Sequence, residues 1–293
     1  MTYKLLSTTF LFMVLFNTAV SAQVPKQEKE ALIDLYNASN GNDWTQKWSL
    51  NSPVESWYGV DVLNNHVVSI ILYENNLEGR IPASLKNLKK LEVLDLALNS
   101  LNGQLPQELA ELGELKALKL EDNQLTGSLS KNFGSLVKLK ELILFKNNFE
   151  GKIPSSIANV KSLRILDLSN NRFEGNLPET MANMTNLTKL NLGNNAFEGE
   201  VKFSFDGMRN LSELSLASNR FNGNVPSGIA SLTELQSLQL QNNDFAFFDT
   251  IQNMKSAYLN TFETDDLKLN LKYQELLDTD NRMASNQFEG SND

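Results

Sequence analysis

The chain has 293 residues, a formal net charge of −9 at pH 7, one histidine and no cysteine. The acidic balance disfavours nucleic acid and anionic lipid surfaces as partners, because both carry charge of the same sign. The absence of cysteine excludes the small secreted domains that are stapled by disulfides, and no histidine–cysteine spacing predicts a metal site. We therefore expect neither a cofactor nor a bound metal.

Residues 1–22 have the features of a signal peptide. Lys4 supplies the positive start, residues 11–20 form a mostly apolar run, and residues 20–22 are a small-residue cleavage site before Gln23. A membrane anchor is the weaker interpretation, because the run is shorter than the roughly 20 apolar residues that a spanning helix needs. We expect a secreted or cell-envelope protein whose mature chain has no transmembrane anchor.

Residues 23–66 predict an N-terminal cap. The spacing of apolar residues favours an amphipathic helix over residues 26–39, and a hairpin over residues 56–66 leads into the rest of the chain. The cap holds every tryptophan of the sequence: Trp44, Trp48 and Trp57. We expect these indoles to seal the next segment by burial, and stacking on a carbohydrate is the alternative.

From Val67 onwards the chain repeats one 24-residue pattern eight times, L-x-x-L-x-L-x-x-N-x-L-x-G-x-I-P-x-x-L-x-x-L-x-x. The copies begin at Val67, Leu91, Leu115, Leu139, Leu163, Leu187, Leu211 and Leu235. Such a period predicts a solenoid, in which stacked copies share one continuous core. The solenoid is expected over residues 67–246. A C-terminal cap with an acidic tail is expected over residues 247–293, because Phe247 stands where the pattern needs glycine.

Two positions of the pattern predict how the copies are joined. Position nine is always asparagine, whose amide is expected to pair backbone groups of its own copy and of the next one. The resulting ladder comprises Asn75, Asn99, Asn123, Asn147, Asn171, Asn195, Asn219 and Asn243. Position eleven is leucine in three copies and then phenylalanine in five, which predicts a column of stacked core rings: Phe149, Phe173, Phe197, Phe221 and Phe245.

The L-x-G-x-I-P stretch resembles the plant-type leucine-rich repeat family, which includes plant receptor ectodomains, polygalacturonase-inhibiting proteins and secreted bacterial proteins. The resemblance covers residues 67–246. It implies an α/β solenoid: a right-handed superhelix with a concave parallel sheet, a second short strand after each asparagine turn, 3₁₀ or short helical segments on the convex side, and caps at both ends. In the cap, Val62 stands where the family's W-x-G-V-x-C motif has cysteine, which is similar to secreted bacterial members with a cysteine-free cap.

Catalytic residues are not predicted. The only histidine, His66, lies at the corner of the expected hairpin, where a solvated turn residue is the simpler interpretation. Carboxylates on the expected concave face suit acid–base chemistry or calcium binding in principle: Asp95, Glu121, Asp122, Glu141 and Asp167. Basic residues are interleaved with them, so we interpret them as part of a solvated surface.

A ligand is expected on the concave face, where positions two, three, five, seven and eight point outwards. Copies one to four present apolar and aromatic side chains among charges, which is typical of a protein interface. The candidate binding residues are Ile71, Tyr73, Leu98, Lys119, Glu121, Ile143 and Phe145. Copies six to eight present small or polar groups instead: Thr188, Asn191, Gly193, Asn194, Ser212, Ser215, Ser218, Gln239, Gln241 and Asn242.

The sequence favours an exported, non-enzymatic protein that binds a protein ligand on copies one to four. Tyr73 and Phe145 lie three expected strands apart, about 14 Å, which is the span of a protein or peptide epitope. A glycan or cell-wall polysaccharide bound on the polar copies is the alternative of another class. A structural or adhesive surface protein is the third.

We expect the exported protein to begin at Gln23, because the small residues at positions 20–22 suit signal peptidase. Intact-mass spectrometry of the exported protein measures this directly. An exported form that retains Met1 would contradict the interpretation of residues 1–22 as a signal peptide.

Overall fold

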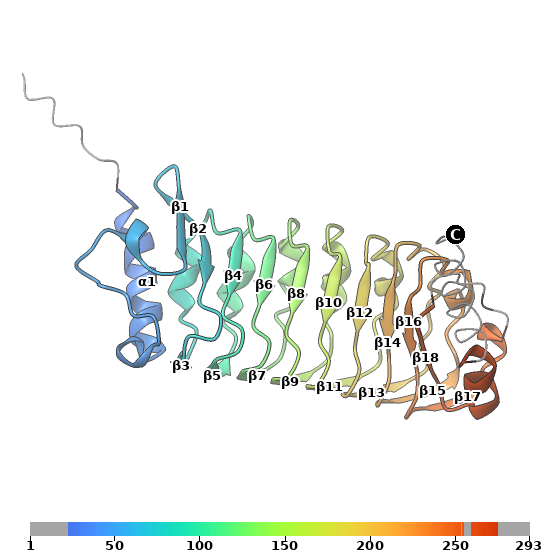
Figure 1. The fold of residues 1–293 in the computed structure, drawn as a ribbon. Coiled ribbons are helices and arrows are strands. Elements are labelled where there is room, and N and C mark those ends of the chain that lie inside the picture. The colour runs from blue at the N-terminus through green and yellow to red at the C-terminus, as the bar shows by residue number, and fades with distance from the viewer. Residues whose placement is uncertain (1–22, 253, 255–258, 275–293) are drawn as a thin grey trace, which may run out of the picture.

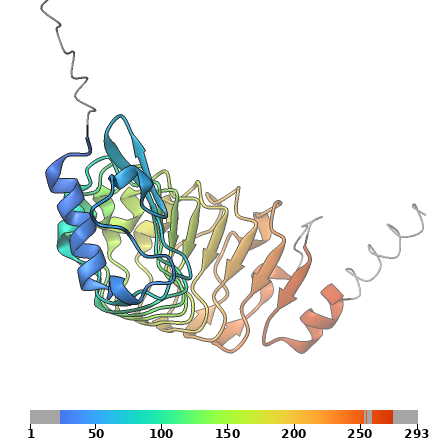
Figure 2. The same ribbon diagram turned by 60° about the vertical axis from the view of Figure 1, so that its left-hand side comes forward.

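The computed structural model describes residues 23–252, 254 and 259–274. The expected signal peptide, residues 1–22, and the end of the acidic tail, residues 275–293, lie outside the described residues. The chain forms an elongated, curved solenoid in which two sheets and a row of 3₁₀ turns make the sides of each coil (Figures 1 and 2). The predicted solenoid with a parallel concave sheet is confirmed.

The larger sheet has ten strands and lines the concave side. In spatial order they are β1 (Val60–Leu63), β2 (His66–Ile71), β4 (Val93–Asp95), β6 (Ala117–Lys119), β8 (Glu141–Ile143), β10 (Ile165–Asp167), β12 (Lys189–Asn191), β14 (Glu213–Ser215), β16 (Ser237–Gln239) and β18 (Thr261–Glu263). β1 and β2 pair antiparallel, and the later neighbours pair parallel with equivalent pattern positions side by side. Position four therefore faces the core, while positions three and five face the concave side.

The smaller sheet has eight parallel strands, one after each asparagine turn. They are β3 (Glu78–Gly79), β5 (Ser100–Gln104), β7 (Gln124–Gly127), β9 (Asn148–Gly151), β11 (Arg172–Gly175), β13 (Ala196–Gly199), β15 (Arg220–Asn224) and β17 (Asp244–Phe247). The seven glycines at position thirteen have φ between 73° and 124°, a left-handed value that favours glycine. In copy eight, where Phe247 replaces this glycine, the pairing of β17 with β15 shifts register.

Short 3₁₀ turns line the convex side of the solenoid. They are η3 (Ala83–Asn87), η4 (Gln107–Glu111), η5 (Phe133–Ser135), η6 (Ser155–Asn159), η7 (Glu179–Asn183), η8 (Ile229–Ser231) and η9 (Asp249–Ile251). The five-residue turns all follow a proline, whose fixed φ suits this entry. Where Ser130 replaces proline the turn has three residues, and where Lys202 replaces it no 3₁₀ turn occurs between β13 and β14, all of whose connection is described.

The asparagines at position nine form the predicted ladder, but each amide pairs with its own copy and the preceding one, not with the next one as expected. Asn147 is representative: its Nδ2 donates to the carbonyls of Leu120 in the preceding copy (2.9 Å) and Leu144 in its own copy (3.2 Å). Its Oδ1 accepts the N–H of Leu125 (2.9 Å). The same bonds recur at Asn99, Asn123, Asn171, Asn195, Asn219 and Asn243. Each amide thus joins two copies and leaves no buried partner unsatisfied.

Groups outside the eight copies close both ends of the ladder. At the start, Asn75 Oδ1 accepts the N–H of Gln46 from the cap (2.6 Å). At the end, the Asp265 carboxylate accepts the N–H groups of Asn242 (2.8 Å) and Asn243 (3.2 Å). An acidic residue of the expected C-terminal cap therefore takes the place of the turn carbonyls of the next copy, which accept the equivalent N–H groups in the preceding copies.

The aromatic column at position eleven is confirmed. Neighbouring rings from Phe149 to Phe245 stack with centroids 6.1 Å apart and interplanar angles of 3° to 12°. Four of the five rings are at most 1% exposed, and Phe245 at the end of the column is 8% exposed. The column is therefore part of the continuous core that the leucines also fill.

The N-terminal cap consists of α1 (Lys26–Ala38), η1 (Gly41–Asp43), η2 (Val54–Ser56) and the β1–β2 hairpin. Its three tryptophans are 1–4% exposed, so their rings are core and have no free face for a carbohydrate. Each indole N–H donates to a carbonyl of the cap: Trp44 to Ser39 (2.8 Å), Trp48 to Tyr58 (2.8 Å) and Trp57 to Ser49 (3.1 Å). The expected burial is confirmed.

Glu28 of α1 ties the cap to the first copy. Its carboxylate, 5% exposed, accepts the N–H of Val67 (2.8 Å) and contacts Nδ1 of His66 (2.6 Å). Val67 opens the first copy, where no preceding copy offers a carbonyl. The expectation that His66 is merely a solvated turn residue is wrong, because the ring helps to hold Glu28 against the start of β2.

The concave sheet continues by one strand beyond the eighth copy. β18 pairs with β16 in the register Ser237↔Thr261, and Leu259 and Phe262 are buried at the places of pattern positions one and four. Residues 267–274 are helical, and the Tyr273 ring stacks on Phe262 with centroids 4.2 Å apart. A partial ninth copy thus lies within the segment expected to be the C-terminal cap.

Asn147→Ala is expected to lower the free energy of unfolding by about 1–3 kcal/mol, because it leaves buried backbone groups of two copies without partners. Chemical denaturation monitored by circular dichroism measures the change. Asn222→Ala is the matched control: Asn222 is exposed on β15, so the expected change is below about 0.5 kcal/mol. Equal losses in the two variants would contradict the role of the ladder.

Candidate binding site on the concave sheet

The middle of the concave face is a row of side chains at pattern position five. Strand pairing sets them side by side in the order Ile71, Asp95, Lys119, Ile143, Asp167, Asn191, Ser215, Gln239 and Glu263. Neighbouring strands lie about 4.8 Å apart, so the row is about 40 Å long. Asp95 and Lys119 separate the two isoleucines, so the candidate apolar residues form two groups and not one patch.

Positions seven and eight lie beyond the strands, which corrects the expectation of simple outward alternation. Small residues at position seven, such as Ala97 and Ala217, are buried, so only larger side chains project there. Position eight has φ between 49° and 58° in all eight copies. Leucine adopts this left-handed conformation at a cost of roughly 1–2 kcal/mol. Leu98 nevertheless occupies it, half-exposed, beside a hollow that Glu74 and Asp122 also line.

The first apolar group lies at the N-terminal end of the sheet. Ile71 and Tyr73 are 43% and 45% exposed, at and just after the end of β2. Tyr58, 50% exposed, belongs to the same end, because the carbonyl of its neighbour Gly59 accepts the N–H of Ile71 (2.7 Å). The repeat pattern misses Tyr58, which precedes the first copy and is brought beside β2 only by the hairpin.

A charged band follows the first apolar group. Lys119 Nζ lies 3.0 Å from the Glu141 carboxylate, and this hydrogen bond raises the pKa of Lys119. Glu121 is half-buried, and its Oε2 has no hydrogen-bond partner among the described residues. Burial, and then the negative charges of Asp95 and Asp167, raise the pKa of the Glu121 carboxyl. The Oε2 atom is itself buried, so this carboxylate is held partly out of solvent without a compensating partner.

The second apolar group consists of Ile143 in β8 and Phe145 just beyond it, both half-exposed. Ile165 in β10 adds a half-exposed side chain beside them at position three, and Val93 does the same in β4. The candidate residues omit these two, although position three faces the same side of the sheet as position five.

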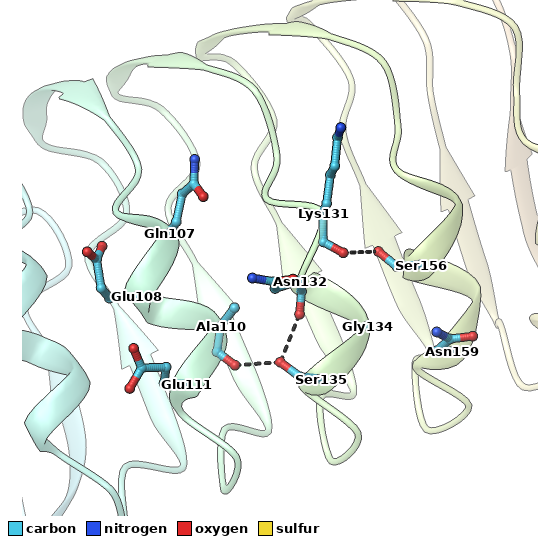
Figure 3. Close-up of a pocket in the computed structure, with 10 residues that line it drawn as sticks. All are labelled: Gln107, Glu108, Ala110, Glu111, Lys131, Asn132, Gly134, Ser135, Ser156 and Asn159. Carbon is cyan, nitrogen blue, oxygen red and sulfur yellow. Dashed lines mark hydrogen bonds between the residues drawn. The ribbon is translucent and has the colours of Figure 1, made fainter.

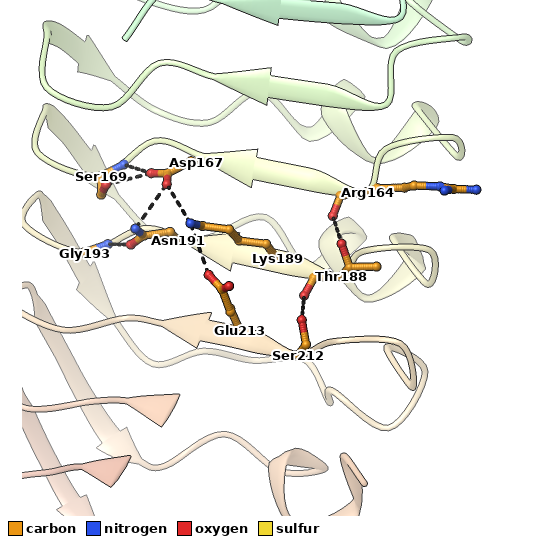
Figure 4. Close-up of polar contacts among 9 residues, drawn as sticks. All are labelled: Arg164, Asp167, Ser169, Thr188, Lys189, Asn191, Gly193, Ser212 and Glu213. Carbon is orange, nitrogen blue, oxygen red and sulfur yellow. Dashed lines mark hydrogen bonds and ion pairs between the residues drawn. The ribbon is translucent and has the colours of Figure 1, made fainter. Parts of the chain in front are cut away.

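Polar side chains that bond one another occupy the following copies (Figure 4). Asp167, 5% exposed, accepts hydrogen bonds from the Ser169 hydroxyl (2.7 Å) and the Asn191 amide (3.3 Å). Lys189 lies 3.6 Å from Asp167 and 3.1 Å from Glu213. Burial lowers the pKa of Lys189, but its contacts with Glu213 and Asp167 outweigh burial and raise it.

Most of the side chains that were expected to serve a glycan have partners within the protein. Asn191, Asn194, Gln239, Gln241 and Asn242 donate to other side chains, and Thr188 and Ser212 donate to backbone carbonyls. The polar half of the row is therefore a bonded network, which offers a ligand fewer free donors than its composition indicates.

A hollow of ≈ 530 Å³ lies on the convex side, between η4, η5 and η6 (Figure 3). Polar groups at its wall already join neighbouring copies: Ser135 Oγ donates to the carbonyl of Ala110 (2.6 Å), and Ser156 Oγ donates to that of Lys131 (2.6 Å). The hollow lies at the copy where Ser130 replaces proline and the 3₁₀ turn is short. We interpret it as a consequence of that replacement.

Residues 23–252, 254 and 259–274 contain no group of three or more histidine or carboxylate side chains that could hold a metal ion. None of the described helices is long and apolar enough to cross a membrane.

Family models match most of the solenoid. The leucine-rich repeat region model matches residues 115–264, just over half of the chain, and a second leucine-rich repeat model matches residues 65–125. Solved structures of plant proteins resemble the chain along most of its length. A plant ice-binding protein is 25% identical with a TM-score of 0.71, over 83% of this chain and 79% of that one.

Plant receptors with bound peptide hormones resemble it as well. The Arabidopsis receptor kinase HAESA, in complex with the peptide hormone IDA and the co-receptor SERK1, is 27% identical with a TM-score of 0.69, over 82% of this chain and 41% of that one. The plant peptide hormone receptor RGFR1, in complex with RGF2, is 31% identical with a TM-score of 0.60, over 64% and 31%. The chain spans less than half the length of either receptor.

Glu121→Gln is expected to raise the melting temperature at pH 7 and to change it little at pH 4. The pKa of this carboxyl is raised in the folded protein, so its ionised form opposes folding once the pH exceeds the pKa of the unfolded chain. Below that pH the acid is mostly protonated in both states. Calorimetry at the two pH values measures the effect.

The control for this prediction is Glu141→Gln, which removes the ion pair with Lys119 and should not stabilise the protein. A lower melting temperature of Glu121→Gln at pH 7 would contradict the prediction. It would mean that the ionised Glu121 carboxylate has a partner and stabilises the folded protein.

Proposed function

Because the chain belongs to the plant-type leucine-rich repeat family, we propose that it is an exported, non-enzymatic protein that binds a protein or peptide ligand on the N-terminal half of its concave face. The observation that carries the proposal is the pair of ring-bearing apolar groups around Tyr73 and Phe145. They stand about 14 Å apart on a rigid sheet, with a charged band between them.

The comparisons support ligand binding in general. The HAESA and RGFR1 structures are complexes with the peptide hormones IDA and RGF2, and they resemble this chain over 82% and 64% of its length. Because the chain spans only part of those receptors, their hormones and co-receptors do not transfer to it. The physical arrangement of the face is the more specific argument.

The face suits an extended segment with two apolar anchors and a hydrogen-bond donor between them. Interface energy is concentrated in aromatic anchors with polar surroundings. Tyr73 and Ile71 provide one such place and Phe145 with Ile143 the other, while the half-buried Glu121 carboxylate lies between them. An amine or guanidinium on the ligand would offset the cost of holding this carboxylate half-buried.

Leu98 supports the same location. Its left-handed backbone costs more for leucine than for asparagine, which occupies position eight in copies five, six and eight. Keeping a half-exposed leucine there opposes folding, so a ligand contact is the simplest benefit. Leu98 borders the same hollow as Glu74, which directly follows Tyr73.

Export rests on the signal-like residues 1–22 and on the resemblance to receptor ectodomains. We propose that the protein works outside the cell or in its envelope. The lack of a predicted nucleophile, metal site or cofactor site in the sequence supports binding without catalysis.

Ice binding is the second candidate function. The plant ice-binding protein matches this chain over most of both lengths, unlike the receptors. Position eight carries short polar groups in copies five to eight, namely Asn170, Asn194, Ser218 and Asn242, at the regular spacing of the strands. Inhibition of ice recrystallisation by the purified protein, lost on Asn194→Leu, would favour this candidate.

Tyr73→Ala combined with Phe145→Ala is expected to weaken binding of the protein ligand by at least about 2 kcal/mol, because interface anchors typically contribute that much. The melting temperature should change little, because Tyr73 is exposed and Phe145 half-exposed. The ligand is first captured from the producer's envelope and medium, identified by mass spectrometry and then titrated by calorimetry.

The matched control is Gln239→Ala with Gln241→Ala, two side chains on the polar half that donate to Glu263. It should leave the titration unchanged. Binding that is lost in the control pair and kept in the aromatic pair would move the site to the polar half. A large fall in melting temperature for the aromatic pair would place those rings in the core.

A further inference from the structure

The edge of the concave sheet where the strands begin carries a row of charges, which we call the entry rim and define by pattern positions 21 to 24 and two. In copies one to three, three of its lysines pair with carboxylates of neighbouring copies, whereas Lys90 forms no ion pair with a described residue. Lys89 lies 3.1 Å from Glu111, Lys116 lies 2.5 Å from Glu92, and Lys138 lies 2.5 Å from Glu114. These three lysines are therefore electrically compensated.

The entry rim changes character from copy four onwards. Lys140, Arg164 and Arg209 are exposed, and none of the three side chains forms an ion pair or a hydrogen bond with a described residue. Hydrogen bonds from Ser204 and Ser231, and to a lesser degree the charge of Arg209, lower the pKa of the nearby Asp206 carboxyl. Three uncompensated cations thus gather on a protein whose net charge is −9.

These cations line one groove of ≈ 840 Å³ that runs along the rim from copy four to copy eight. Its other lining side chains are four hydroxyls, three amides and a single carboxylate, Glu234, and no apolar side chain contributes. Figure 4 shows Arg164, Thr188 and Ser212 at the entry ends of β10, β12 and β14, apart from the Asp167 network. Four strand spacings make the groove about 19 Å long.

We propose that this groove binds an anionic polysaccharide. Guanidinium and ammonium groups without protein partners suit carboxylate or sulfate groups along such a chain. The hydroxyls of Thr188 and Ser212 donate to backbone carbonyls (3.1 and 3.0 Å), so their oxygens remain free to accept from sugar hydroxyls.

The lining explains why a polysaccharide fits better than a peptide. A peptide ligand gains most of its affinity from apolar anchors in desolvated pockets, and this groove has none. Its length and its hydroxyl and amide walls suit a hydrophilic chain that lies along several copies. Because the protein as a whole is acidic, the attraction is local and should weaken with salt.

This site is independent of the proposed protein-binding function. It lies at positions 23, 24 and two of copies four to eight, whereas the proposed ligand site lies at positions five, seven and eight of copies one to four. Loss of one activity therefore does not imply loss of the other.

Calorimetric titration of the purified protein at low salt tests the groove with alginate, dextran sulfate and neutral dextran as probes. We expect binding of alginate or dextran sulfate and none of dextran, and the better of the two identifies carboxylate or sulfate as the recognised group. Lys140→Gln, Arg164→Gln and Arg209→Gln together should lower the affinity at least about tenfold, because all three direct contacts are lost.

The matched control is Lys89→Gln with Lys116→Gln and Lys138→Gln. It removes the same number of positive charges from the entry rim, but from lysines that already pair with carboxylates. The affinity should therefore change less than about threefold. The Tyr73→Ala, Phe145→Ala variant should bind the polysaccharide normally, which separates this site from the proposed function. Unchanged melting temperatures verify that all variants are folded.

Three results would overturn the proposal. The first is no binding of either anionic polysaccharide at low salt. The second is an equal loss of affinity in the control triple variant, which would mean that net charge and not the groove attracts the polymer. The third is equally tight binding of polyglutamate, which would mean that any acidic polymer is accepted.

Discussion

The hydrogen bonds of the position-nine asparagine hold the solenoid together where regular strands end. After position five the backbone leaves the concave sheet, and backbone bonds between copies satisfy only part of its polar groups; carbonyls at position six and N–H groups at position eleven bond to the asparagine amides. The amide of Asn147 satisfies groups in its own copy and in the copy before it, and leucines cannot do this. Together with the backbone pairing of the concave strands, this bond keeps neighbouring copies in register along the binding face.

The same constraint explains why the turn dictates which side chains a ligand meets. To bring the asparagine inwards, the residue before it takes a left-handed backbone in all eight copies. Position eight is therefore pushed outwards whatever its chemistry, and position seven projects only when its side chain is too large to bury. Leu98, Tyr73 and Phe145 stand out on this face because the turn holds them there and the core has no room for them.

Much of the fold was predictable because each position of the repeat contacts equivalent positions in the neighbouring copies. One sequence pattern therefore indicates both the local structure and the contacts between copies. An asparagine recurring every 24 residues indicates both the turn and a partner in a neighbouring copy, and phenylalanines at the same spacing indicate a stacked column. The contacts between Glu28 and His66 and between Asp265 and Asn242 were not predictable, because they occur once and join segments with no common pattern. β18 was missed because Phe262 and Thr264 replace the leucines that mark a copy.

The positions that point outwards on the binding face were predictable from the sequence. Which of their side chains are exposed, buried or bonded to one another was not. Lys116 is paired because Glu92 lies one copy earlier, and Lys189 is paired with Asp167 in the same way. The composition of the face therefore does not tell which polar side chains bond one another and which are free to bind a ligand. Tyr58 joined the face through a hairpin outside the repeat. Glu121 was expected on the surface, and only the structure places it half-buried with a buried oxygen that has no partner among the described residues.

The closure of the asparagine ladder by Gln46 at one end and Asp265 at the other has a consequence for how such a chain can change length. Both closing groups contact only the copy next to them, and each interior copy contacts only its two neighbours. A deletion or duplication of one whole copy within the phenylalanine column would rejoin equivalent surfaces and leave both seals intact. The fold therefore tolerates insertion or deletion of whole copies, each of which changes the length of the concave face by about 4.8 Å. Insertion of part of a copy would break the match between neighbouring copies.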